Sequence, residues 1–386
     1  MSKLVTAPEQ ATATIYDRIG VRTIINASGA TTAVGGTLMP REVIDAMISA
    51  SKSFVVIDEL NRAVGKKIAE VTGAEDGYVT AGSAAAMLVA VAGCIAGVDP
   101  VKVRKLPDSD GMANEVIIHR MHRIGYDQMF RAAGGKFVEI GMPRRTEDWE
   151  LEDAINENTA CVIWIDSPAT GPGPLPFEQV VEISHRHGVP VVVDAASTLP
   201  PKEHITRWIA QGADLAIYSG GKGIRGPQDS GLLAGRADLI AAARANGAPN
   251  TGVGRAAKVS KEAMAGLYVA LERFESFDHE AEHAERAEMA RMMASALDGL
   301  DGVEIVAVTD PSAYPMPVVQ LYPAMPGPKG TPRPATWTPA QLGTDLASGE
   351  PSIHGKIEWD HYGIHTHTLQ GGEPEQIVEA VRAAMK

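Results

Sequence analysis

The sequence contains little cysteine and fewer basic than acidic side chains. Only two cysteines occur among its 386 residues. Cys94 lies in an apolar helical run and Cys161 begins a strand, so we expect two buried thiols rather than a disulfide. The 48 acidic residues outnumber the 35 basic ones and give a net charge of −13. This balance argues against a nucleic-acid partner, because phosphate contacts require clustered lysine and arginine.

Long apolar runs are also missing. No segment approaches the ~20 apolar residues of a membrane span, and the N-terminal residues lack the apolar core of a signal peptide. We therefore expect a cytoplasmic protein without membrane contact. The hydrophobic fraction of 45% and the charged fraction of 22% are typical of a globular protein. A chain of 386 residues is long enough for a large and a small domain.

Short strand patterns alternate with helical patterns between residues 77 and 246. Such alternation predicts a mainly parallel sheet with helices on both faces. The helix expected at 81–96 is apolar nearly all round, which indicates that it is buried. After Gly254 the pattern changes to a long helical stretch at 260–297 followed by short strands, which is typical of a second domain.

The predicted organisation is an α/β fold in three parts. These are an N-terminal arm at 1–40, a large domain at 41–255 and a small C-terminal α+β domain at 256–386. Within the small domain, residues 322–338 are rich in proline and glycine. We expect this segment to form a loop that could act as a lid.

Lys222 has an unusual setting. An apolar strand-like run ends at Ser219, two glycines precede the lysine, and two more follow at Gly223 and Gly226. Small residues let a backbone approach a ligand closely and permit positive φ. Lys222 is therefore a candidate covalent amine; the alternative is a surface lysine in a glycine turn.

Asp194 ends a buried-strand pattern that begins at Val189. A carboxylate in such a place is costly unless it is paired, although a strand-end aspartate can also cap the next turn. A lysine that forms a Schiff base and a carboxylate for a pyridinium nitrogen are what pyridoxal phosphate (PLP) chemistry requires. Lys222 and Asp194 together therefore predict a PLP enzyme.

The junction around Gly82, Ser83 and Ala84 is a strand–turn–helix pattern. Free amide groups at a helix start, together with a serine hydroxyl, can bind a phosphate, whereas an ordinary serine N-cap would give the same pattern. The first sheet strand leads into the edge that the later strands face, which favours the phosphate interpretation. Ser219, three residues before Lys222, is a second candidate for a phosphate contact.

Two histidines follow the strand pattern at 115–118. An imidazole above the cofactor ring could stack on it and move protons, or each histidine could simply be hydrogen-bonded in a loop. We favour His122 over His119, because His119 can still belong to the strand. His365 and His367 would share a strand face, but a metal site needs further ligands at suitable spacing, so we predict no metal.

Three basic residues are candidates for binding the substrate. Arg145, with its neighbour Arg144, could bind a carboxylate or phosphate bidentately, or the two arginines could be a surface pair that faces Glu147 and Asp148. Arg225 is close to Lys222 in sequence and is the better anion clamp by position. Lys258 follows a loose G-x-G-x-x-A motif that does not follow a strand, so the dinucleotide interpretation fails. We expect instead a basic loop that reaches a phosphate in its own or a neighbouring subunit.

Taken together, these residues resemble the bacterial L-seryl-tRNA(Sec) selenium transferase-like family of fold-type I PLP enzymes. The segments that carry the resemblance are Ile25–Gly29, Gly82–Ala86, Glu115–Ile118, Val193–Ala196, Ser219–Lys222 with Gly226–Gln228, and Gly254–Lys261. The resemblance implies that Lys222 is the Schiff-base lysine and Asp194 the partner of the pyridinium nitrogen. It also implies homodimers or larger homo-oligomers with shared active sites. Near Arg145 the chain departs from the family's pattern, and only Arg145 and Thr146 carry over.

Two departures distinguish the chain from the selenium transferase itself. That enzyme has an N-terminal tRNA-binding domain, whereas here the core pattern begins within ~25 residues of Met1. The net charge of −13 is also poor for holding tRNA. Relatives without that domain are amino-acid lyases and dehydratases.

We therefore predict a PLP-dependent lyase that removes a Cα proton and eliminates a β group from a hydroxy or sugar amino acid. Lys222 would be the general base at Cα and could protonate a leaving hydroxyl. A racemase, an aldolase and a selenium transferase acting on seryl-tRNA remain alternatives, because they share the carbanion-stabilising groups. Outside this group, the alternatives are a cofactor-binding protein without catalysis and a Rossmann-type oxidoreductase. The second is disfavoured because the strand–G-x-G-x-x-G–helix unit is missing.

Overall fold

The computed structural model describes residues 14–167, 170–310, 316–323 and 337–385. Contacts between Cα atoms divide these residues into two compact units. The larger unit contains residues 30–285 and the described part of 309–316. The smaller unit contains residues 14–29, 286–308 and the described part of 317–385.

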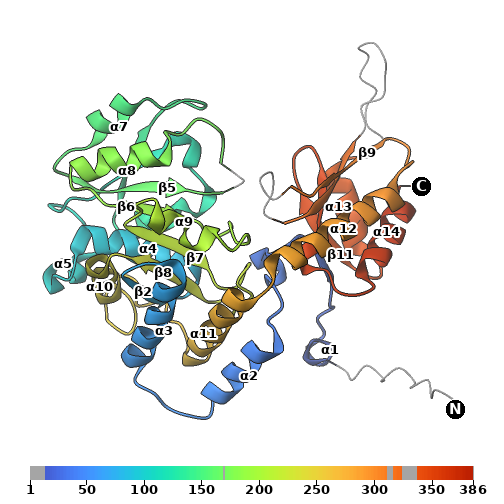
Figure 1. Ribbon diagram of the computed structural model, residues 1–386, viewed down its shortest axis with the longest axis horizontal. Helices are drawn as coiled ribbons and strands as arrows, with labels where there is room; N and C mark the ends of the chain where they lie inside the picture. The colour runs from blue at the N-terminus through green and yellow to red at the C-terminus, as the bar shows by residue number, and fades with distance from the viewer. Residues whose placement is uncertain (1–13, 168–169, 311–315, 324–336, 386) are drawn as a thin grey trace. The chain divides into compact units, whose positions relative to one another are not determined.

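A seven-stranded sheet forms the centre of the larger unit (Figure 1). Its strand order is β2-β8-β7-β6-β5-β3-β4, and all neighbouring pairs are parallel except the two that involve β8. The strands are β2 (Asp76–Thr80), β3 (Glu115–His119), β4 (Lys136–Ile140), β5 (Thr159–Ile165), β6 (Val191–Asp194), β7 (Leu215–Ser219) and β8 (Gly231–Gly235). The predicted α/β fold with a mainly parallel sheet is thereby confirmed.

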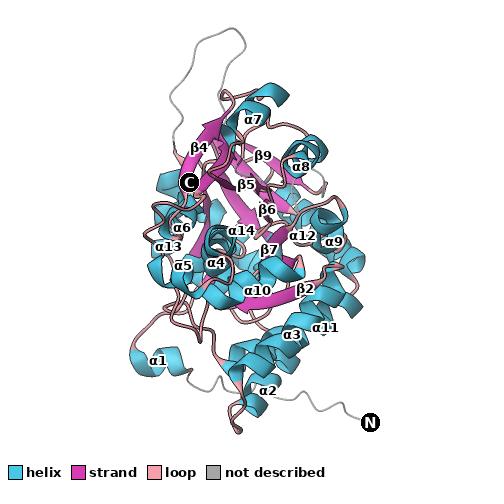
Figure 2. Ribbon diagram, turned by 90° about the vertical axis from the view of Figure 1, so that its left-hand side faces the viewer, coloured by secondary structure: helices cyan, strands magenta, loops and turns pink. Residues whose placement is uncertain are grey.

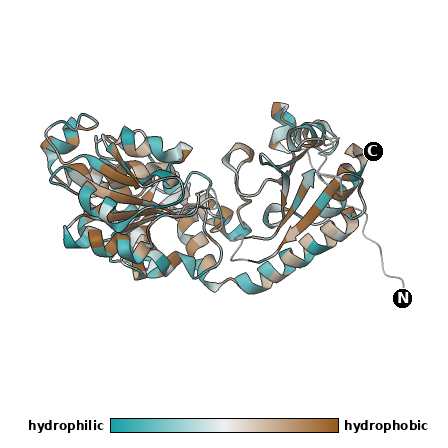
Figure 3. Cartoon of the chain, turned by 90° about the horizontal axis from the view of Figure 1, so that it is seen from above, coloured by the Kyte–Doolittle hydropathy of each residue, from teal (hydrophilic) through white to brown (hydrophobic). Residues whose placement is uncertain are grey.

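Helices cover both faces of this sheet (Figure 2). Successive strand residues point to opposite faces; Val191 and Val193 join one hydrophobic core, and Val192 joins the other. The first core includes residues of α2 (Arg41–Ala50), α3 (Ile57–Thr72), α7 (Asp148–Ala154), α8 (Phe177–Arg186), α9 (His204–Ala210) and α11 (Lys261–Ser276). The second includes residues of α4 (Gly82–Ala96), α5 (Pro100–Lys105), α6 (Gln128–Ala132) and α10 (Ala237–Asn246). Because both faces are covered, the strands are predominantly hydrophobic (Figure 3).

The helix predicted at 81–96 is confirmed as the buried α4. Its alanines and Gly93 allow α10 to lie close against it, since a Cβ on Gly93 would come within 3.0 Å of the Ala243 nitrogen. The short elements of this unit are η1 (Thr32–Val34), η2 (Arg120–His122) and η3 (Gly125–Asp127).

The smaller unit is built on a five-stranded sheet of order β1-β11-β12-β10-β9. Its strands are β1 (Ile25–Ala27), β9 (Val303–Val308), β10 (Val318–Pro323), β11 (Ile353–Ile357) and β12 (Tyr362–His365). Its helical elements are α1 (Ile15–Ile19), the part of α12 (His279–Leu297) from Arg286 onwards, α13 (Pro339–Ser348), η4 (Thr366–Thr368) and α14 (Glu373–Ala384). Residues of α12, α13 and α14 form the hydrophobic core with this sheet.

The observed units divide the chain differently from the predicted bounds. Strand β1 pairs with β11 and so places residues 25–27 of the predicted arm in the smaller unit. Helix α11 packs on α2 and α3, so the larger unit extends to Glu285. The amphipathic pattern of α11 was visible in the sequence, but its packing partner was not. Of the predicted lid at 322–338, residues 324–336 lie outside the described part, and Tyr322 belongs to β10.

Gly65 and Gly77 mark the closest approach of α3 to β2. Alanine normally stabilises a helix interior by about 1 kcal/mol relative to glycine. A Cβ on Gly65 would, however, overlap the carbonyl oxygen of Gly77, and such overpacking costs about 1–3 kcal/mol. We expect Gly65→Ala to lower the free energy of unfolding, measured by chemical denaturation. Gly125→Ala is the matched control, because no atom lies within 4 Å of its Cβ position; equal effects of both changes would contradict the packing argument.

Candidate active site

The candidate residues follow the ends of strands that meet at one edge of the seven-stranded sheet. Strands β2 and β7 run parallel to each other because both are antiparallel to β8. The carboxyl ends of β2, β3, β6 and β7 therefore lie at the same edge, which is where open α/β sheets bind ligands. Asp194 is the last residue of β6, and Gly82, His122 and Lys222 come two or three residues after the ends of β2, β3 and β7.

Lys222 and Asp194 are electrostatically coupled. Burial lowers the pKa of the Lys222 ammonium, and the Asp194 carboxylate partly opposes that shift. Asp194 is only 5% exposed, and burial raises its pKa to about 6. The Ala196 N–H, at 3.0 Å from Asp194 Oδ1, and the charge of Lys222 act in the opposite direction. The predicted pair thus consists of a partly desolvated amine and a buried carboxylate.

The glycines around Lys222 allow the chain to pack closely against itself. A Cβ on Gly221 would collide with the Cα of Gln228, and one on Gly223 with the carbonyl of Leu199. The Thr37 hydroxyl donates to the carbonyl oxygens of Gly221 and Lys222, at 3.1 Å each. None of the four glycines at 220, 221, 223 and 226 has a positive φ. Of the two predicted reasons for these glycines, close approach therefore applies and positive φ does not.

The predicted phosphate-binding residues lie around the start of β8. Ser219 is the register partner of Gly231, and a Cβ on Gly231 would come within 2.7 Å of the Ser83 nitrogen. Ala81, not Ser83, is the N-cap of α4, and no side chain caps this helix. The first N–H groups of α4 are therefore free of side-chain caps, as a bound anion would require.

Space is also present at this helix start. Gly82 has φ 74°, and no described atom lies within 4 Å of the position that a Cβ would take there. Amide donors, two nearby serine hydroxyls and open space fit a phosphate group. The residues present therefore fit PLP at both ends, with the carboxylate of Asp194 for the ring nitrogen.

His119, at the end of β3, and His122, just after it, are both buried beside Trp164. The His122 ring lies 4.7 Å from that of Trp164, and the His119 ring lies 5.6 Å from it. Nδ1 of His122 accepts the Ile165 N–H at 3.3 Å, which leaves the ring proton on Nε2. Burial lowers the pKa of His122 to about 4 and, with a contribution from His122, that of His119 to about 3. Both imidazoles are therefore neutral at neutral pH.

The register of the sheet brings His122 towards Asp194. Ile165, whose N–H binds His122, is the register partner of Asp194 in the neighbouring strand. His119 is the last residue of β3, as expected. The role of His122 above a cofactor ring stays a prediction.

The three basic candidates occupy different settings. Arg145 closes a tight turn in which the Met142 N–H donates to its carbonyl at 2.7 Å; its side chain is 79% exposed and pairs with Glu147. This contact agrees with the alternative prediction that the arginine faces acidic residues at the surface instead of binding the substrate. Arg225 pairs with Glu282 of α12. Lys258 is exposed in the loop after Gly254. Their roles in substrate binding stay predictions.

Asp166 is a site residue that the sequence analysis did not single out. It follows β5, and its N–H donates to the carbonyl of Asp194 at 2.8 Å. Burial raises its pKa, while Arg207 and His204 oppose the shift. The charge of Asp166 in turn raises the pKa of Asp194. The sequence contained a signal for Asp166, because an aspartate directly follows the apolar strand β5 and another ends the apolar strand β6.

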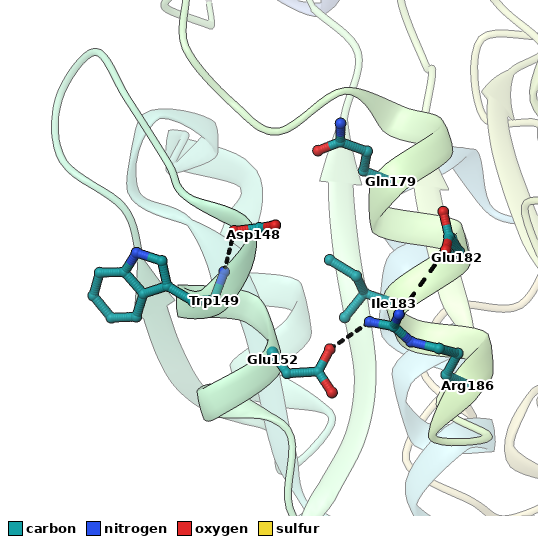
Figure 4. A pocket seen from close by; sticks show the side chains of 7 residues that line it. All are labelled: Asp148, Trp149, Glu152, Gln179, Glu182, Ile183 and Arg186. Carbon is teal, nitrogen blue, oxygen red and sulfur yellow. Dashed lines mark hydrogen bonds and ion pairs between the residues drawn. The ribbon is translucent and has the colours of Figure 1, made fainter.

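A separate groove of about 390 Å³ lies between α7 and α8 (Figure 4). It is lined by Asp148, Trp149, Glu152, Gln179, Glu182, Ile183 and Arg186. Arg186 pairs with Glu152 at 2.6 Å and with Glu182 at 3.9 Å, which neutralises much of its charge. Within the described ranges, no cluster of three potential metal ligands and no helix able to cross a membrane is found.

The raised pKa of Asp194 predicts a pH-dependent effect of Asp194→Asn on the stability of the cofactor-free fold. Without cofactor, the buried carboxyl binds its proton more tightly in the folded than in the unfolded chain. Its ionisation therefore costs stability as the pH rises from 3.8 to about 6, by about 3 kcal/mol. We expect Asp194→Asn to stabilise the cofactor-free protein by an amount that grows over this range and stays constant above it. Chemical denaturation between pH 4 and 8 measures this, and a pH-independent difference would contradict it.

Comparison with known proteins supports the interpretation of this site as a PLP site. The family model described as L-seryl-tRNA selenium transferase matches residues 24–301. D-glucosaminate-6-phosphate ammonia lyase from Salmonella typhimurium is 38% identical over 68% of this chain and 70% of its own length. A 5'-C-glycyluridine monooxygenase-decarboxylase from a Streptomyces species is 37% identical over 69% of this chain and 66% of its own length.

More distant relatives are L-seryl-tRNA(Sec) selenium transferases, such as that of Desulfovibrio desulfuricans, with 26% identity. The match to it spans 66% of this chain and just over half, 55%, of that enzyme. The solved structure of D-glucosaminate-6-phosphate ammonia-lyase superposes with a TM-score of 0.82 at 30% identity, covering 97% of this chain and 98% of that one. Serine palmitoyltransferase from S. paucimobilis, with a TM-score of 0.59 at 13% identity over 94% and 87% of the two chains, shares the fold alone. The fold-type I architecture is confirmed, and the chain belongs to the SelA family, whose model is described as L-seryl-tRNA selenium transferase.

Proposed function

We propose that this chain is a PLP-dependent lyase that acts on a hydroxy or sugar amino acid. The observation that carries the proposal is the coupled pair of Lys222 and Asp194 at the carboxyl edge of the sheet. The similarity to an enzyme named D-glucosaminate-6-phosphate ammonia lyase, in sequence and over almost the whole structure, favours a sugar amino acid.

Different site residues would bind the ring nitrogen and the phosphate of the cofactor. Asp194 would hold the protonated ring nitrogen, and its burial makes a nearby positive charge favourable. The amide groups of Gly82, Ser83 and Ala84 and the hydroxyl of Ser219 would hold the phosphate. When bound, pyridoxal phosphate withdraws electrons from the substrate Cα and so makes its proton acidic.

Lys222 would move the protons of the reaction. Because burial lowers its pKa, a larger fraction of Nζ is unprotonated at neutral pH than in an exposed lysine. Nζ can then accept the Cα proton and deliver it to the oxygen of the β-hydroxyl, which leaves as water. Arg225 would bind an acidic group of the substrate through its guanidinium.

The proposal includes self-association, in line with the dimers or larger assemblies expected for the family. Apolar side chains are exposed on both sides of α2 in the sequence: Phe54 is 100% exposed and Leu38 72%. Leu38 adjoins Thr37, whose hydroxyl binds the Lys222 carbonyl. Exposed apolar side chains are typical of association surfaces, and a second subunit that covers Leu38 would also border the Lys222 loop. A cytoplasmic location, as expected from the sequence, belongs to the same proposal.

The covalent role of Lys222 can be tested by spectroscopy. After incubation with pyridoxal phosphate, wild type is expected to absorb visible light and, after borohydride reduction, to carry a stable adduct on Lys222 located by mass spectrometry. Lys222→Ala should show neither feature, because it lacks the amine that attacks the aldehyde. Lys202→Ala is the matched control. Identical spectra for wild type and Lys222→Ala, with no adduct, would contradict the PLP assignment.

The reaction itself is tested by product analysis on D-glucosaminate-6-phosphate and on serine of both configurations. A lyase should release ammonia and a keto acid in equal amounts, and Lys222→Ala should lose at least about a hundredfold in rate, as expected for general base catalysis. Inversion at Cα without ammonia would indicate a racemase. Release of an aldehyde would indicate an aldolase, and either result would overturn the lyase proposal.

Self-association predicts a defined effect of Phe54→Asp. A charge in a desolvated interface weakens it, so light scattering coupled to gel filtration should show a shift towards the monomer and a loss of activity. Val101→Asp, which changes an apolar residue that is 74% exposed on α5, should leave the mass unchanged. A monomeric wild type with full activity would rule out a shared site.

A further inference from the structure

A short segment from near the N-terminus lies against the Lys222 loop. The sequence places residues 1–40 in an arm, but from Ala30 onwards they belong to the larger unit. The hydroxyl of Thr37 donates to the carbonyl oxygens of Gly221 and Lys222, at 3.1 Å each. Thr37 and Lys222 are 185 residues apart in the chain, so only folding brings them together. This segment therefore holds the backbone of the candidate amine directly.

Two glycines shape the turn that presents Thr37. Gly35 and Gly36 have φ values of 90° and 73°, a conformation that residues with a side chain rarely adopt. The carbonyl of Thr31 accepts the N–H of Val34 at 3.2 Å and the N–H of Gly36 at 3.0 Å, which closes the turn. A closed turn holds the residue that follows it in a defined place.

Gly36 packs closely against the Lys222 loop. A Cβ at Gly36 would lie 2.8 Å from the carbonyl oxygen of Gly221 and would overlap the side-chain amide of Gln228. By contrast, no described atom lies within 4 Å of the Cβ position at Gly35. The two neighbouring glycines thus share a left-handed conformation, but only Gly36 has the loop against it.

The carbonyl group of Lys222 is also held from within its own loop. It accepts the Arg225 N–H at 2.9 Å, and the Gly226 N–H donates to the Gly220 carbonyl at 2.7 Å. Arg225 has φ 57°, the only positive φ of a non-glycine residue in the part of the chain that the structure describes. A carbonyl oxygen has two lone pairs, and the Thr37 hydroxyl and the Arg225 N–H together use both.

The place of the Lys222 backbone decides where its amine can reach. Burial lowers the pKa of Lys222, and the carboxylate of Asp194 opposes that shift, so the amine is buried within reach of the charge of Asp194. The four-carbon stem of a lysine is flexible, so the backbone anchor limits where the amine can lie. A displacement of about 1 Å at a reacting group can cost about a hundredfold in rate.

We propose that Thr37 is a positioning residue for Lys222: its hydroxyl anchors the backbone of Lys222 and so keeps the amine in its buried place near Asp194. The inference rests on the proposed function and extends it to a residue from a distant segment. Thr37 acts through the backbone of Lys222 and does not touch the reacting atoms.

The test compares Thr37→Val, which loses the hydroxyl but keeps the shape, with Thr37→Ser, which keeps the hydroxyl. Lysines of the cofactor-free protein are labelled competitively with acetic anhydride over a range of pH, and mass spectrometry then gives the pKa of Lys222 Nζ. Thr37→Val should raise this pKa towards the ordinary lysine value, because a loosened loop lets water reach the amine. Thr37→Ser should match wild type.

The same variants are then incubated with pyridoxal phosphate, and the adduct on Lys222 is trapped with borohydride at successive times. Thr37→Val should form the adduct about tenfold more slowly than wild type, as expected for the loss of a hydrogen bond that holds the loop. Thr37→Ser should restore the wild-type rate. Both measurements are independent of the substrate.

Three further variants separate positioning from a loss of stability. Thr72→Val removes a buried hydroxyl that donates to the Ile68 carbonyl at 2.7 Å in α3, so it should lower stability and leave Lys222 unchanged. Gly36→Ala should repeat the effect of Thr37→Val, whereas Gly35→Ala carries the same backbone strain without the clash and should not. If Gly36→Ala does not fold, the comparison of Thr37→Val with Thr37→Ser decides alone.

An unchanged pKa of Lys222 and an unchanged rate of adduct formation in Thr37→Val would overturn the role of Thr37. An equal effect of Thr72→Val, or no rescue by Thr37→Ser, would do the same. The labelling in the cofactor-free protein separates the two proposals. If wild type forms no adduct but Thr37→Val shifts the pKa of Lys222, the PLP function fails and the anchoring role of Thr37 stands.

Discussion

The site depends on the burial of a carboxylate and an amine close to each other at the end of a parallel sheet. Asp194 has little exposure, and its pKa rises although the Ala196 N–H and Lys222 stabilise its charge. A sheet covered on both faces provides this environment, because its strand ends are the only places where polar groups can be presented without breaking the core. The cost of burying Asp194 would make it a strong partner for a cationic ring nitrogen, as proposed for the cofactor.

The loop around Lys222 holds the amine in this environment through close packing. Gly221 and Gly223 lie where a Cβ would collide with neighbouring backbone, and Thr37 binds two carbonyl groups of the loop. The strained backbone at Arg225 is part of the same arrangement. The loop is thus shaped by two distant segments, around residues 37 and 199, and by its own continuation at Gln228, and small local changes there would move the amine.

Much of this site could be predicted from local patterns in the sequence. An apolar strand that ends in a single polar residue is visible at Asp194, and the glycines around Lys222 indicate a constrained loop. Asp166 also follows an apolar strand, but the sequence showed no residue that could be recognised as its partner. The pairing of Arg225 with Glu282 could not be predicted, because the two residues are far apart in the chain and helix α12 gives no sign of the loop that it meets.

The sequence by itself determined the elements, the two-sided burial of the sheet and the candidate residues for PLP chemistry, because these follow from periodicity and side-chain type. Only the tertiary structure decided that β1 pairs with β11 and that α11 belongs to the larger unit. It also decided that Ser219 lies near the start of α4 through Gly231, and that Arg145 pairs with Glu147 at the surface. These relations depend on which surfaces pack together, and packing between distant segments leaves no local pattern in a single sequence.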